Sequence, residues 1–344
     1  MHSNYAKILS LIIPSYNSAS YLRNCLDSLV IDDEAIEVIV VDDGSSDETF
    51  AIATEYQVKY PGIFKAISQP NKGHGGAINT GLLAAEGQYI KIVDSDDWLN
   101  KKGFKSIVDR LKSLTEKPDL LLSNFVIDKV GKKHKSIIHY RQSLTADTML
   151  SWEDTKRLKL GKYFMMHAVI YKKDILVRSG LVLPKHTFYV DYIYMYQPLP
   201  YVESIYYMDV DLYHYFIGRD DQTIAEQNHI KNVHHQINVN KLMTNILAKN
   251  WNDDKIKSHQ LRKYMISYLT ICTVITSALL LVEGSKSSLD KKVELWCYLK
   301  QENPEIYQEV RFGYLGIMIN LPTKVGRSLS IFIYRLSRKI IGFS

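Results

Sequence analysis

Cysteine is scarce in this chain, and the marks of several specialised protein classes are missing. The 344 residues include three cysteines, Cys25, Cys272 and Cys297, too few and too scattered for a disulfide framework or a cysteine-based zinc site. No secretory signal peptide is expected, because the first apolar run has only the length of a strand. With 46% hydrophobic and 23% charged residues, disorder is excluded as the main state. Buried thiols and a cytoplasmic location are therefore expected.

Net positive charge is also lacking outside the C-terminal end. The segment from residue 311 onward has no Asp or Glu and carries six cations: Arg311, Lys324, Arg327, Arg335, Arg338 and Lys339. These six equal the net charge of +6 of the whole chain, so the remainder is neutral overall. A nucleic-acid partner is therefore not expected.

Short apolar strands alternate with helices between residues 8 and 110. Strands are predicted at 8–13, 37–41, 64–67 and 89–93, separated by helices and polar turns. This order favours right-handed crossovers and a mostly parallel α/β sheet. Ligands bind beyond the carboxyl ends of such strands, and three of these ends carry unusual polar residues.

The strongest chemical signal is the turn Asp94-Ser95-Asp96-Asp97, which follows the strand at 89–93. Three carboxylates in four positions repel one another, and burying them without a cation is costly. Mg²⁺ or Mn²⁺ would relieve that repulsion while also holding phosphate oxygens. An acidic turn that caps the next helix is the alternative interpretation.

Two further segments follow strand ends. Asp42-Asp43 places carboxylates where a base N–H or a ribose hydroxyl can be bound, although a helix cap is the competing interpretation. The segment 71–79 combines glycines, which permit close backbone approach, with Lys72 and His74, which could face phosphate. It matches neither a P-loop nor a dinucleotide fingerprint, so a plain loop remains open there.

Taken together, residues 9–99 resemble the nucleotide-sugar-binding half of bacterial family 2 glycosyltransferases of GT-A fold. The matching pieces are Ile12 to Asn17, Val41 to Ser45, Asn71 to Gly81, Gly87 to Ile90 and Asp94 to Asp97. The resemblance implies a GT-A nucleotide-binding sheet flanked by helices, followed by a helical C-terminal region. The halves of the GT-A domain are expected at 1–110 and 111–225, and the helical region at 226–344.

The resemblance also implies roles for individual residues. Asp43 is expected to read the uracil N3–H, with Pro14 and Tyr16 beside the base. Asp96 is expected to bind the metal directly and Asp94 to bind the metal or the ribose. The donor-binding set implied by the matching segments further includes Asn17, Lys72, Gly75, Asn79 and Ser95.

A second acidic site and a donor-closing loop are expected downstream. Asp191 resembles the general base of the family, although Val190 stands where Glu is common. Residues 213–223 resemble a loop that closes over the donor, in which His214 could bind the metal and Arg219 the diphosphate. A histidine in an aromatic run is, however, more often a hydrogen-bonded core residue.

The expected reaction is metal-dependent transfer of a hexose from a UDP-sugar to a hydroxyl of a lipid-linked or protein-linked glycan. Galactose or glucose is the hexose expected. The transfer would proceed by direct displacement with inversion, with Mn²⁺ or Mg²⁺ as cofactor. The alternatives are nucleotidyl transfer and a non-catalytic nucleotide-sugar-binding protein. The first usually needs a cationic triphosphate loop after the first strand, and Pro14 to Asn17 contain no cation.

The C-terminal third is predicted to be helical. Residues 261–282 are apolar enough to approach a membrane span, but a packed core helix is favoured because polar residues fall mainly on one side. Residues 325–341 form a basic amphipathic pattern, with cations on one side and apolar residues on the other. Peripheral contact with the inner face of a cell membrane and packing on protein, including a homodimer, both remain open.

Overall fold

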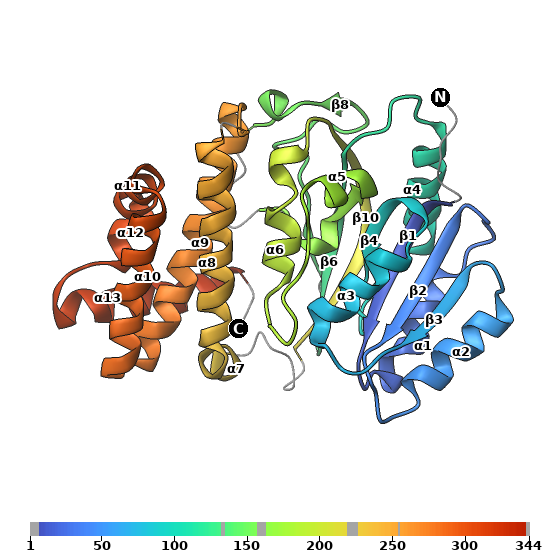
Figure 1. The fold of residues 1–344 in the computed structure, drawn as a ribbon, viewed down its shortest axis with the longest axis horizontal. Coiled ribbons are helices and arrows are strands. Elements are labelled where there is room, and N and C mark those ends of the chain that lie inside the picture. The colour runs from blue at the N-terminus through green and yellow to red at the C-terminus, as the bar shows by residue number, and fades with distance from the viewer. Residues whose placement is uncertain (1–6, 132–134, 157–162, 219–225, 254, 342–344) are drawn as a thin grey trace. The chain divides into compact units, whose positions relative to one another are not determined.

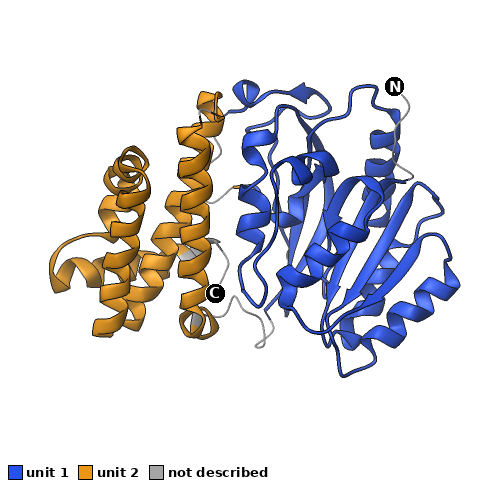
Figure 2. Ribbon diagram, viewed as in Figure 1, with its two compact units in different colours: residues 1–158, 164–218 blue, residues 159–163, 219–344 orange. Residues whose placement is uncertain are grey.

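The computed structural model describes residues 7–131, 135–156, 163–218, 226–253 and 255–341, and the side chains of 226 and 338–341 lie outside this description. Two compact units divide the chain, residues 1–158 with 164–218 and residues 159–163 with 219–344 (Figure 2). The first contains all the strands, and the second is helical (Figure 1).

The first unit is built on a mixed sheet. Its strands are β1 (Lys7–Ser15), β2 (Ile36–Asp42), β3 (Phe64–Ser68), β4 (Gly87–Ile92), β5 (Trp98–Leu99), β6 (Leu120–Lys129), β7 (Ser136–Ile138), β8 (Met149–Leu150), β9 (Val169–Lys172) and β10 (Ile205–Ile217). Its helices are α1 (Ala19–Leu29), α2 (Thr49–Lys59), α3 (Gly73–Ala84), α4 (Lys101–Ser113), α5 (Lys173–Arg178) and α6 (Asp191–Tyr196), with 3₁₀ turns η1 (Trp152–Asp154), η2 (Met166–Ala168) and η3 (Leu199–Tyr201).

The strand order is β3-β2-β1-β4-β9-β6-β10-β5, with β7 beside β6 and β8 beside β10. Strands β3, β2, β1 and β4 are parallel, as the alternating sequence pattern predicts. Strand β9 is antiparallel to both β4 and β6, and β6 is parallel to β10. The expected α/β sheet is therefore confirmed.

Apolar strands place the core at the centre of this sheet. Every residue of β2 and β4 is buried, which agrees with strands covered by helices on both faces. Helix α3 packs on β1 and β2, and α4 packs on β1 and β10. Helix α3 begins at Gly73, where the left-handed backbone (φ +74°) lets the chain turn directly into the helix.

The second unit consists of α7 (Glu226–Lys231), α8 (Val233–Asn252), α9 (His259–Glu283), α10 (Lys286–Glu302), α11 (Pro304–Phe312), α12 (Tyr314–Ile319) and α13 (Thr323–Ile341). Helix α9 has the length and mean hydropathy (2.1) of a membrane span, but 72% of its most apolar window is buried inside the protein. The Asn240 side chain of α8 donates a hydrogen bond to the Thr273 hydroxyl of α9 at 3.0 Å. This polar contact fits the packed core helix expected from the sequence.

Candidate functional site

The carboxyl ends of β1, β2 and β4 meet at one edge of the sheet. Ser15 at the end of β1 is in register with Asp42 of β2, and Ile12 is in register with Ile92 of β4. The Asp43 N–H then donates to the Ser15 carbonyl at 2.8 Å. The polar segments that follow these strands therefore begin side by side, as expected for ligand binding in a parallel sheet.

Asp43 is buried, and its orientation is fixed by two hydrogen bonds. Its Oδ1 accepts from Gln69 Nε2 at 2.6 Å and from the Lys72 backbone N–H at 2.9 Å. Among the residues that the structure describes, no hydrogen bond engages Oδ2. Because both donors use one oxygen, the other can accept an N–H from a bound molecule.

The loop after β1 is fastened to the Asp43 turn by Asn17. The Asn17 N–H donates to Ser45 Oγ at 2.9 Å, and its Oδ1 accepts from the Ser46 N–H at 2.8 Å. Pro14 is buried within β1, whereas 54% of Tyr16 is exposed. Of the residues expected beside the base, Tyr16 is therefore the one that offers an accessible ring, and Asn17 shapes the loop.

The acidic turn after β4 is anchored by strand β10. Asp97 Oδ2 accepts from the Tyr213 hydroxyl at 2.6 Å, and its Oδ1 accepts from the Phe216 N–H at 2.8 Å. The Asp94 N–H donates to the same Tyr213 oxygen at 3.1 Å. Burial, followed by repulsion from Asp96, raises the pKa of Asp94 to about 7. The carboxylates are thus crowded enough to favour a cation between them.

Two buried side chains that sequence reasoning missed complete this cluster. Ligand atoms of Asp94, Asp97 and His167 all lie within 4.8 Å of one another. His167 is 5% exposed, and its Nδ1 has no hydrogen-bond partner among the described residues. Lys91 is fully buried and donates to the His167 carbonyl at 2.8 Å. Burial, aided by Lys91, lowers the pKa of His167 to about 3, so the imidazole is neutral and can bind a metal.

Two expected site residues have other contacts, and a third falls outside the described residues. The Nδ1 of His214 is 2.6 Å from Asp128 Oδ2, and its ring stacks on Trp98. His214 therefore lies outside the group formed by Asp94, Asp97 and His167, and its ring is held by Asp128. The Ser95 hydroxyl is hydrogen-bonded to Ser18 Oγ at 2.8 Å and links two loops. Arg219 lies outside the described residues.

Helix α3 holds the segment that leads to Asp191. The Asn79 side chain donates to the Leu183 carbonyl at 2.8 Å and accepts from the Leu183 N–H at 3.0 Å. A Cβ on Gly75 would lie 2.5 Å from the Pro184 carbonyl oxygen. Asn79 and Gly75, both expected near the donor, thus also hold the 183–186 segment against α3.

Asp191 begins α6 and belongs electrostatically to the acidic cluster. Burial raises the pKa of Asp191 to about 6, with His74 lowering it and Asp94 raising it. His74 Nε2 lies 3.7 Å from Asp94 Oδ1. Residues from β2, α3, β4 and α6 thus meet around one polar centre. With a pKa of about 6, the carboxylate of Asp191 is ionised at neutral pH and still basic enough to take a proton.

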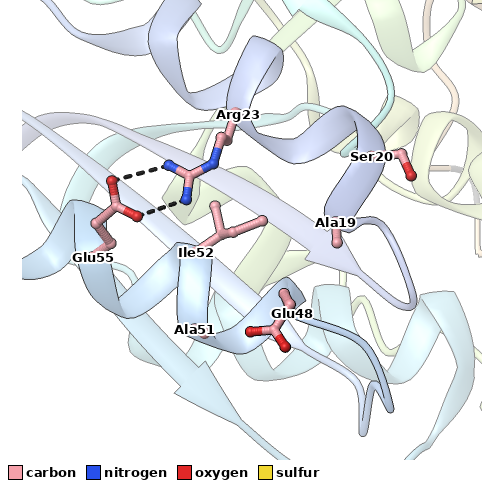
Figure 3. Close-up of a pocket in the computed structure, with 7 residues that line it drawn as sticks. All are labelled: Ala19, Ser20, Arg23, Glu48, Ala51, Ile52 and Glu55. Atoms are coloured by element: carbon pink, nitrogen blue, oxygen red, sulfur yellow. Dashed lines mark hydrogen bonds and ion pairs between the residues drawn. The ribbon is translucent and has the colours of Figure 1, made fainter.

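A surface groove of about 570 Å³ lies between α1 and α2 (Figure 3). Arg23 and Glu55 form a two-bond ion pair across it, at 2.9 and 2.7 Å. Both side chains are half-exposed, and the groove shares no residue with the acidic cluster. The groove is therefore separate from the acidic cluster at the sheet edge.

Comparison with known proteins agrees with this geometry. Residues 10–173 match the model of the family described as Glycosyl transferase family 2. This segment of the chain therefore carries the features of glycosyltransferase family 2. Among curated relatives, it is 31% identical over 226 residues to the putative glycosyltransferase EpsH of Bacillus subtilis, covering 61% of this chain and 60% of EpsH. It is 27% identical over 254 residues to the uncharacterized glycosyltransferase YibD of Escherichia coli, covering 72% of each chain.

The fold of the chain also resembles that of a solved protein fragment. The crystal structure of S. aureus TarS 1–349 superposes with a TM-score of 0.68 at 19% identity, covering 97% of this chain and 92% of that chain. TarS has also been solved in complex with UDP-GlcNAc (TM-score 0.66). The expected fold, a mostly parallel α/β sheet flanked by helices and followed by a helical C-terminal region, is thereby confirmed.

Proposed function

We propose that this protein transfers a sugar from a UDP-linked donor to a hydroxyl of a glycan acceptor by single displacement with inversion. The observation that carries the proposal is the convergence of Asp43, Asp94 and Asp191, which are far apart in the sequence, at one edge of the sheet. The complexes of TarS with UDP-GlcNAc and UDP support the choice of a uridine donor. UDP-galactose and UDP-glucose remain the proposed hexose donors.

Asp43 would bind the uracil. Its Oδ2 can accept the N3–H of a uracil ring, while the hydrogen bonds from Gln69 and Lys72 keep the carboxylate in place. A cytosine ring has no hydrogen at N3 and would leave that buried oxygen without a donor, which costs free energy. This arrangement selects uridine nucleotides.

Asp191 would act as the general base. With its pKa raised to about 6, the carboxylate is ionised at pH 7 and can accept the proton of the acceptor hydroxyl as that oxygen attacks the anomeric carbon. The C–O bond to the new acceptor forms as the bond to the diphosphate breaks, so UDP leaves with its charge and Asp191 keeps the proton. Asn79 supports this step by holding the segment before Asp191.

The acidic turn would hold Mn²⁺ or Mg²⁺. The imidazole of His167 and the carboxylate of Asp94 fit such an ion, and we infer that Asp96 of the same turn adds a further oxygen ligand. Both oxygens of Asp97 already accept hydrogen bonds, so Asp97 positions the turn. When bound, the ion would offset the charge of the departing diphosphate.

The test is sugar transfer and donor hydrolysis with a panel of UDP-sugars, galactose, glucose and N-acetylglucosamine among them, using wild type and Asp191→Asn. The variant is expected to lose at least about a hundredfold in rate while binding UDP as wild type does in calorimetry. Asp109→Asn, an exposed carboxylate of α4 paired with Lys105, is the matched control. Wild-type turnover in Asp191→Asn would overturn the assignment of the base, and release of pyrophosphate from UTP would indicate nucleotidyl transfer.

A further inference from the structure

Helix α13 contacts its own unit through its polar side. Ser330 and Tyr334 are buried, and Ser330 Oγ donates to the Met318 carbonyl of α12 at 2.7 Å. Gly326 stands so close to Leu321 that a Cβ on it would lie 2.8 Å from the Leu321 Cβ. The side of α13 that packs on the protein is therefore made of small and hydroxyl-bearing residues.

The apolar side of the same helix faces solvent. Val325 is 78% exposed and Phe332 62%, and Leu329 and Leu336 are each 46% exposed. At 3.6 residues per turn these four side chains fall within about 60° of one another around the helix. We call them the outer stripe. An amphipathic helix of a globular protein normally buries such a stripe against the core, so the exposure of this one needs a partner.

Positive charge accompanies the outer stripe. Lys324 and Arg335 are exposed and lie beside it on the helical wheel, and no Asp or Glu occurs from residue 311 to the end of the sequence. A partner for this surface must therefore supply an apolar layer and negative charge together. Pairing of the same stripe in two copies would bring the cations of both copies near each other, which is unfavourable.

We propose that the outer stripe of α13 docks in the plane of an anionic lipid bilayer. The four apolar side chains would enter the boundary between head groups and acyl chains, and Lys324 and Arg335 would meet the anionic head groups. Because the opposite side of the helix is fixed to α12, the stripe is presented in a defined orientation. This surface is independent of the acidic cluster and of the reaction proposed for it.

Co-sedimentation of the full chain with vesicles tests the proposal. Wild type is expected to bind vesicles that contain phosphatidylglycerol, to bind pure phosphatidylcholine far more weakly, and to be released by high salt. The double variant Leu329→Ser/Phe332→Ser is expected to lose at least about tenfold in partitioning. Val58→Ser/Val182→Ser, which changes two exposed apolar residues of the first unit, is the matched control and should bind as wild type does.

Melting temperatures establish that the variants are folded, which is expected because the substituted side chains are exposed. Light scattering after size exclusion gives the oligomeric state without lipid. Failure of wild type to bind phosphatidylglycerol vesicles, or equal binding by Leu329→Ser/Phe332→Ser, would overturn the proposal. It would also be overturned by a wild-type dimer that this double variant dissociates, because the stripe would then be a protein interface.

Discussion

The pH dependence of transfer should follow the ionisation of Asp191. Only the ionised carboxylate can take a proton, so the rate falls as the pH drops through the pKa. With that pKa at about 6, the ionised fraction falls from about nine-tenths at pH 7 to about one-tenth at pH 5. We therefore expect kcat/KM to fall about tenfold between these values, measured with saturating metal and subsaturating donor so that the profile reports the free enzyme.

Substitution of His74 should shift the pH dependence of transfer. His74 lowers the pKa of Asp191, so His74→Asn should move the acidic limb of the profile to higher pH. The residual hydrolysis by Asp191→Asn should show no limb near pH 6. A wild-type profile that stays flat from pH 7 to 5, or a limb unchanged in His74→Asn, would refute the reasoning.

Three further substitutions test separate parts of the site. His167→Gln should weaken Mn²⁺ binding at least about tenfold in calorimetry with UDP, whereas His214→Gln should leave the Mn²⁺ affinity unchanged. Equal losses of Mn²⁺ affinity in the two variants would contradict the assignment of His167 as a ligand. Asn79→Ala removes two hydrogen bonds to Leu183 and should lower the free energy of unfolding by about 1–3 kcal/mol. It should also lower kcat while UDP affinity is preserved. An unchanged kcat would argue against a positioning role for Asn79. Asp43→Asn should reduce the preference for UDP over CDP in binding competition, and a preserved preference would exclude it as the uracil-binding group.

The strand ends could be predicted because their signals are local. Apolar β-branched runs that end in Asp43 and in the turn at Asp94 predict both a parallel sheet and the edge at which its polar residues meet. The structure brings those residues together as the pattern requires. The resemblance to family 2 glycosyltransferases could likewise be predicted, because its motifs follow one another in the sequence.

The remaining members of the site depend on contacts that no local pattern encodes. His167 reaches the acidic turn only because β9 returns antiparallel beside β4 and β6. In the sequence, His167 is a lone histidine in an apolar run, and Lys91 is a charged residue inside an otherwise apolar strand. Both patterns are equally typical of core residues with satisfied hydrogen bonds. Likewise, the contact of Asn79 with Leu183 could not be predicted, because it joins residues more than a hundred positions apart.

A crystal soaked with Mn²⁺ and UDP, with anomalous scattering recorded for the manganese, tests the central claim most directly. We expect a manganese peak coordinated by Asp94 and His167 and by diphosphate oxygens, with the uracil N3–H bonded to Asp43. A nucleotide bound away from this sheet edge, or manganese bound without these two side chains, would contradict it.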